Sequence, residues 1–132
     1  MARILLIDDD DILRDTLLQM LELDHHQVTE AVDGERGLQR FGDGRGHDLV
    51  ITDVLMPGMD GTRVIVELRR RRPDIPVLAI SGGRRVLSPD FNLQSASLAG
   101  ANAQLGKPFT RAALQSAVQA ALRAAAGEEA LR

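Results

Sequence analysis

Short apolar runs alternate with longer segments of helical period along this chain, and this alternation limits the possible folds more than any other feature. Ile4–Ile7, Leu49–Ile51 and Val77–Ile80 are short and rich in branched residues, which is typical of strands buried on both faces. Two weaker runs, Gln27–Ala31 and Ala103–Leu105, are also predicted to be strands. The five predicted helices span Asp11–Leu23, Glu35–Phe41, Val64–Arg72, Asp90–Ala99 and Thr110–Ala126, the last of them ended by Gly127. Strict strand–helix alternation predicts an α/β fold, with a parallel sheet, right-handed crossovers and helices on both faces.

Composition excludes several classes of protein. With 132 residues, of which 44% are hydrophobic, the chain is long enough for one domain with its own core. The absence of cysteine excludes disulfides and thiolate metal sites. A net charge of −3 and the lack of tyrosine and tryptophan argue against a nucleic-acid binder. The first apolar run is too short for a signal peptide or a membrane span, so we expect a soluble cytoplasmic protein without membrane contact.

Polar residues with useful chemistry follow four of the predicted strands. Asp8 and Asp9 follow the first strand, Asp53 the third, Ser81 the fourth and Lys107 the fifth. Ligands of such sheets bind beyond the carboxyl ends of the strands, and all five residues fall at that edge. The pattern therefore predicts one site that contains all five.

The residue types at this edge suit phosphoryl transfer. Carboxylates without histidine or cysteine are hard oxygen ligands of the kind that Mg²⁺ takes. A lysine ammonium and a serine hydroxyl can hold phosphoryl oxygens. Phosphoryl transfer needs mainly positioning and neutralisation of charge, and carboxylates are known to form aspartyl phosphates. Asp53 is the acid in the middle of the set and is the predicted nucleophile.

Four motifs resemble those of the receiver domains of two-component response regulators. They are Ile4–Asp10 (ILLIDDD), Leu49–Gly61 (LVITDVLMPGMDG), Val77–Ser81 (VLAIS) and Gly106–Phe109 (GKPF), in the order and at about the spacing of the family. The resemblance covers about residues 2 to 125. It implies a flavodoxin-like, doubly wound sheet of strand order 2-1-3-4-5.

The resemblance also implies a role for each site residue. Asp53 would accept a phosphoryl group from a phosphohistidine of a histidine kinase or a histidine phosphotransfer protein, and the domain would hydrolyse the acyl phosphate slowly. Mg²⁺, with Mn²⁺ as a substitute, would be held by Asp9, by Asp8 directly or through water, by Asp53 and by the backbone carbonyl of Leu55. Ser81 and Lys107 would hold the phosphoryl oxygens. Such a domain catalyses its own modification and is not a conventional enzyme.

Three departures from the family pattern concern the conformational switch and the phosphoryl lifetime. Most receivers place an aromatic residue three positions before the last-strand lysine, where this chain has Gln104. The interval from Ser81 to Lys107 is 26 positions, a few more than expected, and the additional residues are assigned to a loop over Gly82–Pro89. Leu55 and Gly83 offer no polar side chain at two positions that commonly tune hydrolysis.

We assign residues 1–126 to the receiver domain and 127–132 to a short polar tail, without an output domain. The chain would then be a stand-alone receiver or a fragment of a longer protein, acting on an unknown downstream protein. A homodimer through the face formed by its last two helices is possible by family resemblance. Two alternative functions stay open: a phosphorylation-independent adaptor in which Gln104 marks a lost switch, and a magnesium-dependent phosphatase. The phosphatase would need an aspartate where Leu55 stands.

Two further interpretations concern basic residues away from this edge. The run Arg69–Arg72 reads as a solvated last helical turn that matches the helix dipole, with a nucleic-acid patch as the alternative. His47 precedes a buried strand and is expected at the surface.

Overall fold

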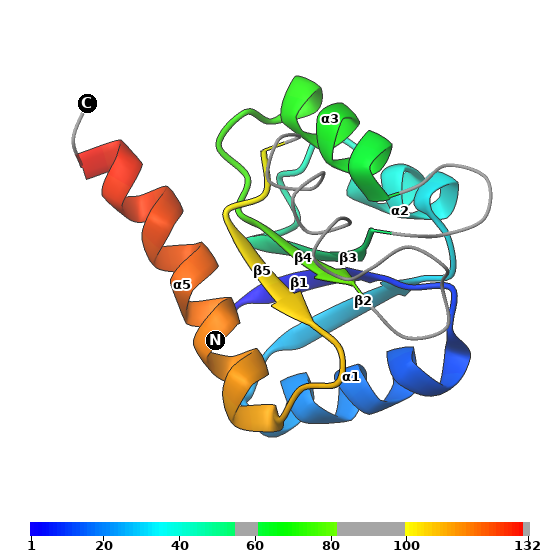
Figure 1. Cartoon of the computed structure of the whole chain (residues 1–132). Helices are drawn as coiled ribbons and strands as arrows, with labels where there is room; N and C mark the ends of the chain where they lie inside the picture. Colours follow the sequence, from blue (N-terminus) through cyan, green and yellow to red (C-terminus); the bar gives the residue numbers. More distant parts are fainter. Residues whose placement is uncertain (55–60, 82–99, 131–132) are drawn as a thin grey trace.

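The computed structural model describes residues 1–54, 61–81 and 100–130, and its centre is a five-stranded parallel sheet (Figure 1). The strand order is β2-β1-β3-β4-β5, so the predicted flavodoxin-like order 2-1-3-4-5 is confirmed. The strands are β1 (Arg3–Ile7), β2 (Gln27–Ala31), β3 (Leu49–Asp53), β4 (Val77–Ser81) and β5 (Ala103–Gly106). Every predicted strand is therefore present, with ends within two residues of those expected from the sequence.

Helices cover both faces of the sheet in the part of the chain that the structure describes. They are α1 (Asp11–Leu23), α2 (Gly34–Phe41), α3 (Gly61–Arg71) and α5 (Arg111–Ala130). In Figure 1, α1 and α5 lie on one side of the sheet and α2 and α3 on the other. Leu5 and Ile7 belong to the core under α2 and α3, whereas Ile4 and Leu6 belong to the core under α1 and α5. This strict alternation explains why β1 has no polar residue between Ile4 and Ile7.

Side chains that cap helix N-termini fix where the helices begin. Asp10 accepts hydrogen bonds from the backbone N–H groups of Ile12 and Leu13, and so begins α1 directly after the acidic run. The Thr110 hydroxyl accepts from the N–H of Ala113 and begins α5, as predicted. Asp10 thus acts as the N-cap of α1.

The C-terminal helix is longer than expected. Gly127 was predicted to end it, but α5 continues to Ala130. A glycine inside a helix costs only about 1 kcal/mol relative to alanine. Alanines precede Gly127 and good helix formers follow it, so the helix continues and the polar tail is shorter than predicted. The predicted helix Asp90–Ala99 and the loop Gly82–Pro89 lie outside the described residues.

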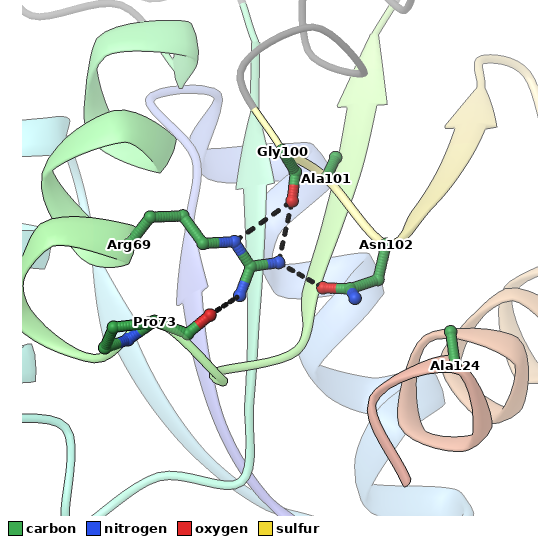
Figure 2. Close-up of a pocket in the computed structure, with 6 residues that line it drawn as sticks. All are labelled: Arg69, Pro73, Gly100, Ala101, Asn102 and Ala124. Atoms are coloured by element: carbon green, nitrogen blue, oxygen red, sulfur yellow. Dashed lines mark hydrogen bonds between the residues drawn. The ribbon is translucent and has the colours of Figure 1, made fainter. Parts of the chain in front are cut away.

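Arg69 binds backbone carbonyls at the amino-terminal edge of the sheet. Its guanidinium donates to the carbonyl oxygens of Gly100 (2.7 and 3.1 Å) and Pro73 (3.1 Å) and to the side chain of Asn102 (Figure 2). It also donates to the carbonyl oxygen of Ile75. These contacts use all five of its N–H groups and join the end of α3 to the segments that lead into β4 and β5. A pocket of about 340 Å³ opens beside them, at the opposite edge of the sheet from Asp53.

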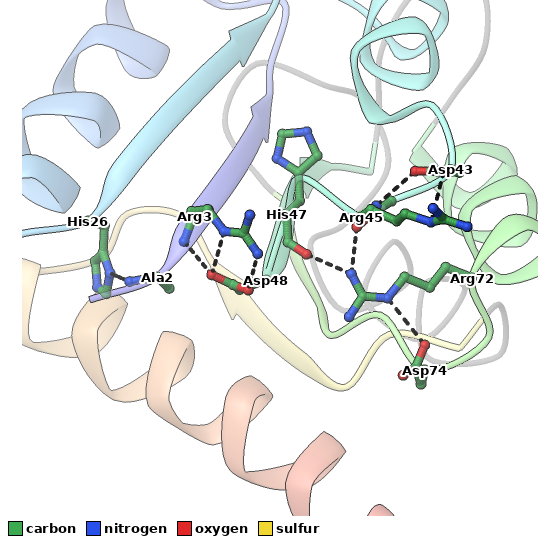
Figure 3. A network of polar contacts seen from close by, with 10 residues as sticks. Ala2, Arg3, His26, Asp43, Arg45, His47, Asp48, Arg72 and Asp74 are labelled. Atoms are coloured by element: carbon green, nitrogen blue, oxygen red, sulfur yellow. Dashed lines mark hydrogen bonds and ion pairs between the residues drawn. The ribbon is translucent and has the colours of Figure 1, made fainter.

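Arg72 and His47 also differ from their predicted surface roles. Arg72 donates to the carbonyl oxygens of Gly44 and His47, both at 2.6 Å, and pairs with Asp74 (Figure 3). The His47 side chain is buried and stacks on Phe41, with ring centroids 6.1 Å apart. The chain turns back over Phe41 because Gly44 adopts a φ of +83°.

The arginine run is therefore not simply a solvated helix end. Arg71 also donates to backbone carbonyls, those of Leu38 and Gly42, whereas Arg70 is exposed and pairs with Glu67. Because Arg69, Arg71 and Arg72 are engaged in this way, they stabilise connections between elements.

No helix within residues 1–54, 61–81 and 100–130 is long and apolar enough to cross a membrane.

Candidate functional site

The carboxyl ends of the central strands bring the predicted acids together. Asp8 and Asp9 follow β1 directly, and Asp53 is the last residue of β3. Ile7 is aligned with Thr52 in the parallel register, so the two acidic segments leave the sheet side by side. One carboxylate oxygen from each of Asp8, Asp9 and Asp53 lies within 4.8 Å of the others. The predicted acidic cluster is therefore present.

Lys107 completes the cluster from the end of β5. Its Nζ atom lies 3.1 Å from Oδ2 of Asp53 and 3.9 Å from Oδ2 of Asp8. The lysine side chain is 13% exposed, so its charge acts on the two acids with little screening by water. Lys107 is the only lysine in the sequence. Its burial and its two ion pairs place the Lys107 side chain within the acidic cluster.

For the predicted site residues Ser81 and Leu55, the structure describes only the backbone of Ser81. Ser81 is the last residue of β4 and is aligned with Gly106, next to Lys107, so its backbone lies at the same edge. Its side chain lies outside what the structure describes. Leu55, predicted to offer its carbonyl oxygen, lies outside the described residues as well.

Asp8 is an acid of the site whose side chain is almost completely buried. It is 1% exposed, and its Oδ1 accepts a hydrogen bond of 2.9 Å from the N–H of Asp10. Its Oδ2 is buried and has no hydrogen-bond partner within the described residues. The pKa of Asp8 is raised to about 6 from 3.8, mainly by burial and also by the charges of Asp53 and Asp9, against the opposite effects of the Asp10 N–H and Lys107. A cation bound beside Oδ2 would offset the free-energy cost of the buried negative charge on Asp8.

A close backbone approach places the start of α3 against the end of β3. The N–H of Gly61 donates to the carbonyl oxygen of Val54 at 2.7 Å, and the N–H of Val54 donates to Ile80 at 2.9 Å. A Cβ atom on Gly61 would lie 2.0 Å from the carbonyl oxygen of Asp53. Only a residue without a side chain fits there, and this contact fixes the backbone that carries Asp53.

Comparison with known proteins identifies the family that has this arrangement. Residues 4–119 match the family profile of the response regulator receiver domain. The chain belongs to this family. The response regulator MprA of Mycobacterium sp. (strain KMS) is 34% identical over 97% of this chain and 54% of its own length. The transcriptional regulatory protein PrrA of Mycobacterium tuberculosis is 36% identical over 92% of this chain and 50% of its own length.

A solved structure confirms the receiver fold. A response regulator receiver domain protein from Clostridium thermocellum superposes over the full length of both chains with a TM-score of 0.83 and 29% identity. The present chain spans about half the length of the curated relatives it matches. It is a receiver domain of two-component signalling, and receiver domains bind Mg²⁺ at an acidic pocket of the kind found here.

The residue at the usual aromatic switch position of receiver domains lies on an exposed part of β5. Gln104 is aligned with Ala79 of β4, and its side chain is exposed. Its neighbours Ala103 and Leu105 pack against the core under α1 and α5, so alternation places Gln104 on the other face of the sheet. Gln104, which stands where most receiver domains have an aromatic residue, thus lies on the face of the sheet that also carries α2 and α3.

Sequence reasoning missed the contribution of Arg14 to this edge. Its guanidinium reaches from α1 to the backbone carbonyl of Asp8, at 2.8 Å. The sequence signal was weak, because an arginine in the first turns of an amphipathic helix normally faces solvent.

Proposed function

We propose that this receiver domain accepts a phosphoryl group on Asp53 in a Mg²⁺-dependent step and thereby changes its contacts with other proteins. One observation carries the proposal: Asp8, Asp9 and Asp53 converge within 4.8 Å, and the Lys107 ammonium lies 3.1 Å from Asp53. A nucleophilic carboxylate, further acids for a metal and a cation for the phosphoryl group are the parts that phosphoryl transfer needs.

The donor set fits Mg²⁺. All three side chains offer oxygen, and Oδ2 of Asp8 is buried without a hydrogen-bond partner in the described part of the chain. Asp8, Asp9 and Asp53 would hold the ion together with the backbone carbonyl of Leu55, and Mn²⁺ would substitute for it. When bound, the ion neutralises charge on the phosphoryl oxygens.

Asp53 acts as the nucleophile in this proposal. One of its carboxylate oxygens attacks the phosphorus of a phosphohistidine on a histidine kinase or a phosphotransfer protein. An O–P bond forms, the P–N bond breaks, and the departing imidazole nitrogen keeps the electron pair and takes a proton from water. Lys107 and the Ser81 hydroxyl hold the transferred oxygens. Water later hydrolyses the acyl phosphate slowly, which returns the carboxylate and releases inorganic phosphate.

The direct test is incubation with a small-molecule phosphodonor, with and without Mg²⁺, followed by intact mass measurement. We expect a single phosphoryl adduct in the native protein that requires Mg²⁺ and is absent from Asp53→Asn. If no adduct forms with several donors, although Mg²⁺ binding is confirmed, the phosphoacceptor role is wrong. That result would favour an adaptor that works without phosphorylation, in which Gln104 replaces the switch residue.

A further inference from the structure

Arg14 connects three elements around the segment that carries the first two acids. Its Nη1 donates to the backbone carbonyl of Asp8 at 2.8 Å, its Nη2 to Asp11 at 2.7 Å and its Nε to Glu30 of β2 at 3.3 Å. The arginine side chain is 13% exposed, whereas Asp11 is 81% exposed and Glu30 is 40% exposed. The bond to Asp8 is thus the most enclosed of the three.

The carbonyl of Asp8 has left the sheet ladder and needs a partner. The Asp8 N–H still pairs with the carbonyl of Ala31 on β2, at 3.1 Å. The chain then turns into α1, and the Asp8 carbonyl accepts from Arg14. A backbone carbonyl near a buried side chain is costly to leave unpaired, so Arg14 fixes the orientation of the peptide that joins Asp8 to Asp9.

The orientation of this peptide matters because the three clustered carboxylates repel one another. The carboxylates of Asp8, Asp9 and Asp53 are close enough to repel one another when no cation lies between them. Asp8 is held by its N–H, by its Oδ1 bond to Asp10 and by its carbonyl bond to Arg14. Asp9 follows directly, and its backbone position depends on the peptide that Arg14 holds.

We propose that Arg14 is a positioning residue for the metal site: it fixes the Asp8–Asp9 peptide so that both carboxylates are set for a divalent cation before the cation binds. This inference rests on the proposed Mg²⁺-dependent function. Groups that orient metal ligands without touching the metal typically change metal affinity by about 10- to 100-fold when they are removed.

The sign of the effect separates positioning from simple electrostatics. Arg14 is a cation near a site for another cation, so by charge alone its removal would strengthen Mg²⁺ binding. If Arg14 positions the ligands, its removal weakens Mg²⁺ binding in spite of the lost positive charge. A residue that only stabilises the fold would lower the free energy of unfolding and leave the affinity of the folded protein unchanged.

The experiment is a titration of the full chain with Mg²⁺ alone, followed by amide NMR signals, without any phosphodonor. Arg14→Met removes both the guanidinium hydrogen bonds and the positive charge, whereas Arg14→Lys keeps the positive charge without the guanidinium. Arg36→Met is the matched control, because Arg36 is 62% exposed and pairs with Asp33, the N-cap of α2, away from Asp8. Glu30→Gln and Asp11→Asn each remove the negative charge of one partner of Arg14 and keep the bond of Arg14 to Asp8.

We expect the Mg²⁺ dissociation constant of Arg14→Met to rise about tenfold, with a smaller rise for Arg14→Lys and values within about threefold of native for the three controls. Urea unfolding without metal shows whether each variant is folded. If Arg14→Met does not fold, Arg14→Lys decides: a rise of about threefold or more supports the inference, and a smaller one overturns it. Binding by Arg14→Met that is as tight as native or tighter also overturns it.

The inference and the proposed function fail in different ways. A native protein that binds no Mg²⁺ overturns the role of Arg14. A native protein that binds Mg²⁺ but gives no adduct at Asp53 overturns the phosphoacceptor role, while the effect of Arg14 on the dissociation constant is still measured.

Discussion

Gly61 and Asp53 approach so closely that a Cβ atom on Gly61 would lie 2.0 Å from the backbone carbonyl oxygen of Asp53. The same Cβ would lie 2.5 Å from Cα of Val54, so both obstacles are backbone atoms that cannot rotate away. Any side chain at position 61 must therefore displace either the start of α3 or the end of β3.

Gly61→Ala is expected to lower the free energy of unfolding by about 1–3 kcal/mol, the range found when an extra methyl group is forced into a packed site. It should also slow phosphorylation, because the displaced backbone carries Asp53. Urea unfolding and the rate of adduct formation measure the two effects. Gly46→Ala is the matched control, since a Cβ there would have no atom within 4 Å. Equal stability of the two variants would contradict the prediction.

Asp8→Asn is expected to stabilise the metal-free protein. The folded-state pKa of Asp8, about 6, lies above its ordinary value of 3.8 because of burial. A raised carboxyl pKa means that protonation favours the folded state, and that this stabilisation is lost as the pH rises through about 6. At neutral pH the ionised group costs up to about 3 kcal/mol, which the neutral amide avoids.

Urea unfolding in the presence of a chelator tests this expectation at neutral pH and near pH 5. The variant should be more stable than native at neutral pH, and the difference should shrink near pH 5, where native Asp8 becomes protonated. Asp11→Asn is a suitable control, because the Asp11 side chain is 81% exposed. Lower stability of Asp8→Asn than of native at neutral pH would show that its charge is well compensated without metal.

The same raised pKa predicts that acid weakens Mg²⁺ binding. A proton on Asp8 competes with the cation, so the dissociation constant should be constant well above pH 6 and rise about tenfold for each pH unit below it. Titrations with Mg²⁺ between about pH 5 and pH 8 measure this dependence. A dissociation constant that does not change below pH 6 would mean that Asp8 is not a ligand.

The residues that the sequence predicted correctly are those whose position follows from strand order. Asp8 directly follows one of the strands that the apolar runs identify and Asp53 ends another, and parallel strands present their carboxyl ends at one edge. Their convergence therefore required no knowledge of side-chain conformation. The same holds for Lys107 at the end of β5.

The residues that the sequence placed wrongly or missed depend on turn geometry and on long side chains. His47 is buried because Gly44 takes a positive φ and returns the chain over Phe41, which the residue types alone do not specify. Arg14 and Arg69 reach distant carbonyls through several rotatable bonds, so helical periodicity cannot identify their partners. A glycine such as Gly127 can end a helix or lie inside one. Here it lies inside α5, because the neighbouring alanines favour helix.

Lys107→Ala is expected to separate metal binding from phosphoryl transfer. Removing the ammonium that lies 3.1 Å from Asp53 leaves the acids less neutralised, so Mg²⁺ should bind at least as tightly as in the native protein. Phosphorylation of Asp53 should slow by about a hundredfold, because a preorganised positive charge for the phosphoryl oxygens is lost. Lys107→Arg keeps the positive charge but carries it on a planar guanidinium, so its phosphorylation rate should lie between those of the native protein and of Lys107→Ala.

The same lysine offers a direct readout in the native protein. Because Lys107 is the only lysine, isotope-labelled methylation of amines gives one side-chain NMR signal besides that of the N-terminus. This signal should shift when Mg²⁺ binds, since the cation competes with Lys107 for Asp53, and shift again when a phosphodonor is added. A signal that responds to Mg²⁺ but not to phosphorylation would show that Lys107 neutralises the acids without holding the phosphoryl group. In that case Lys107→Ala should become phosphorylated at a rate near that of the native protein.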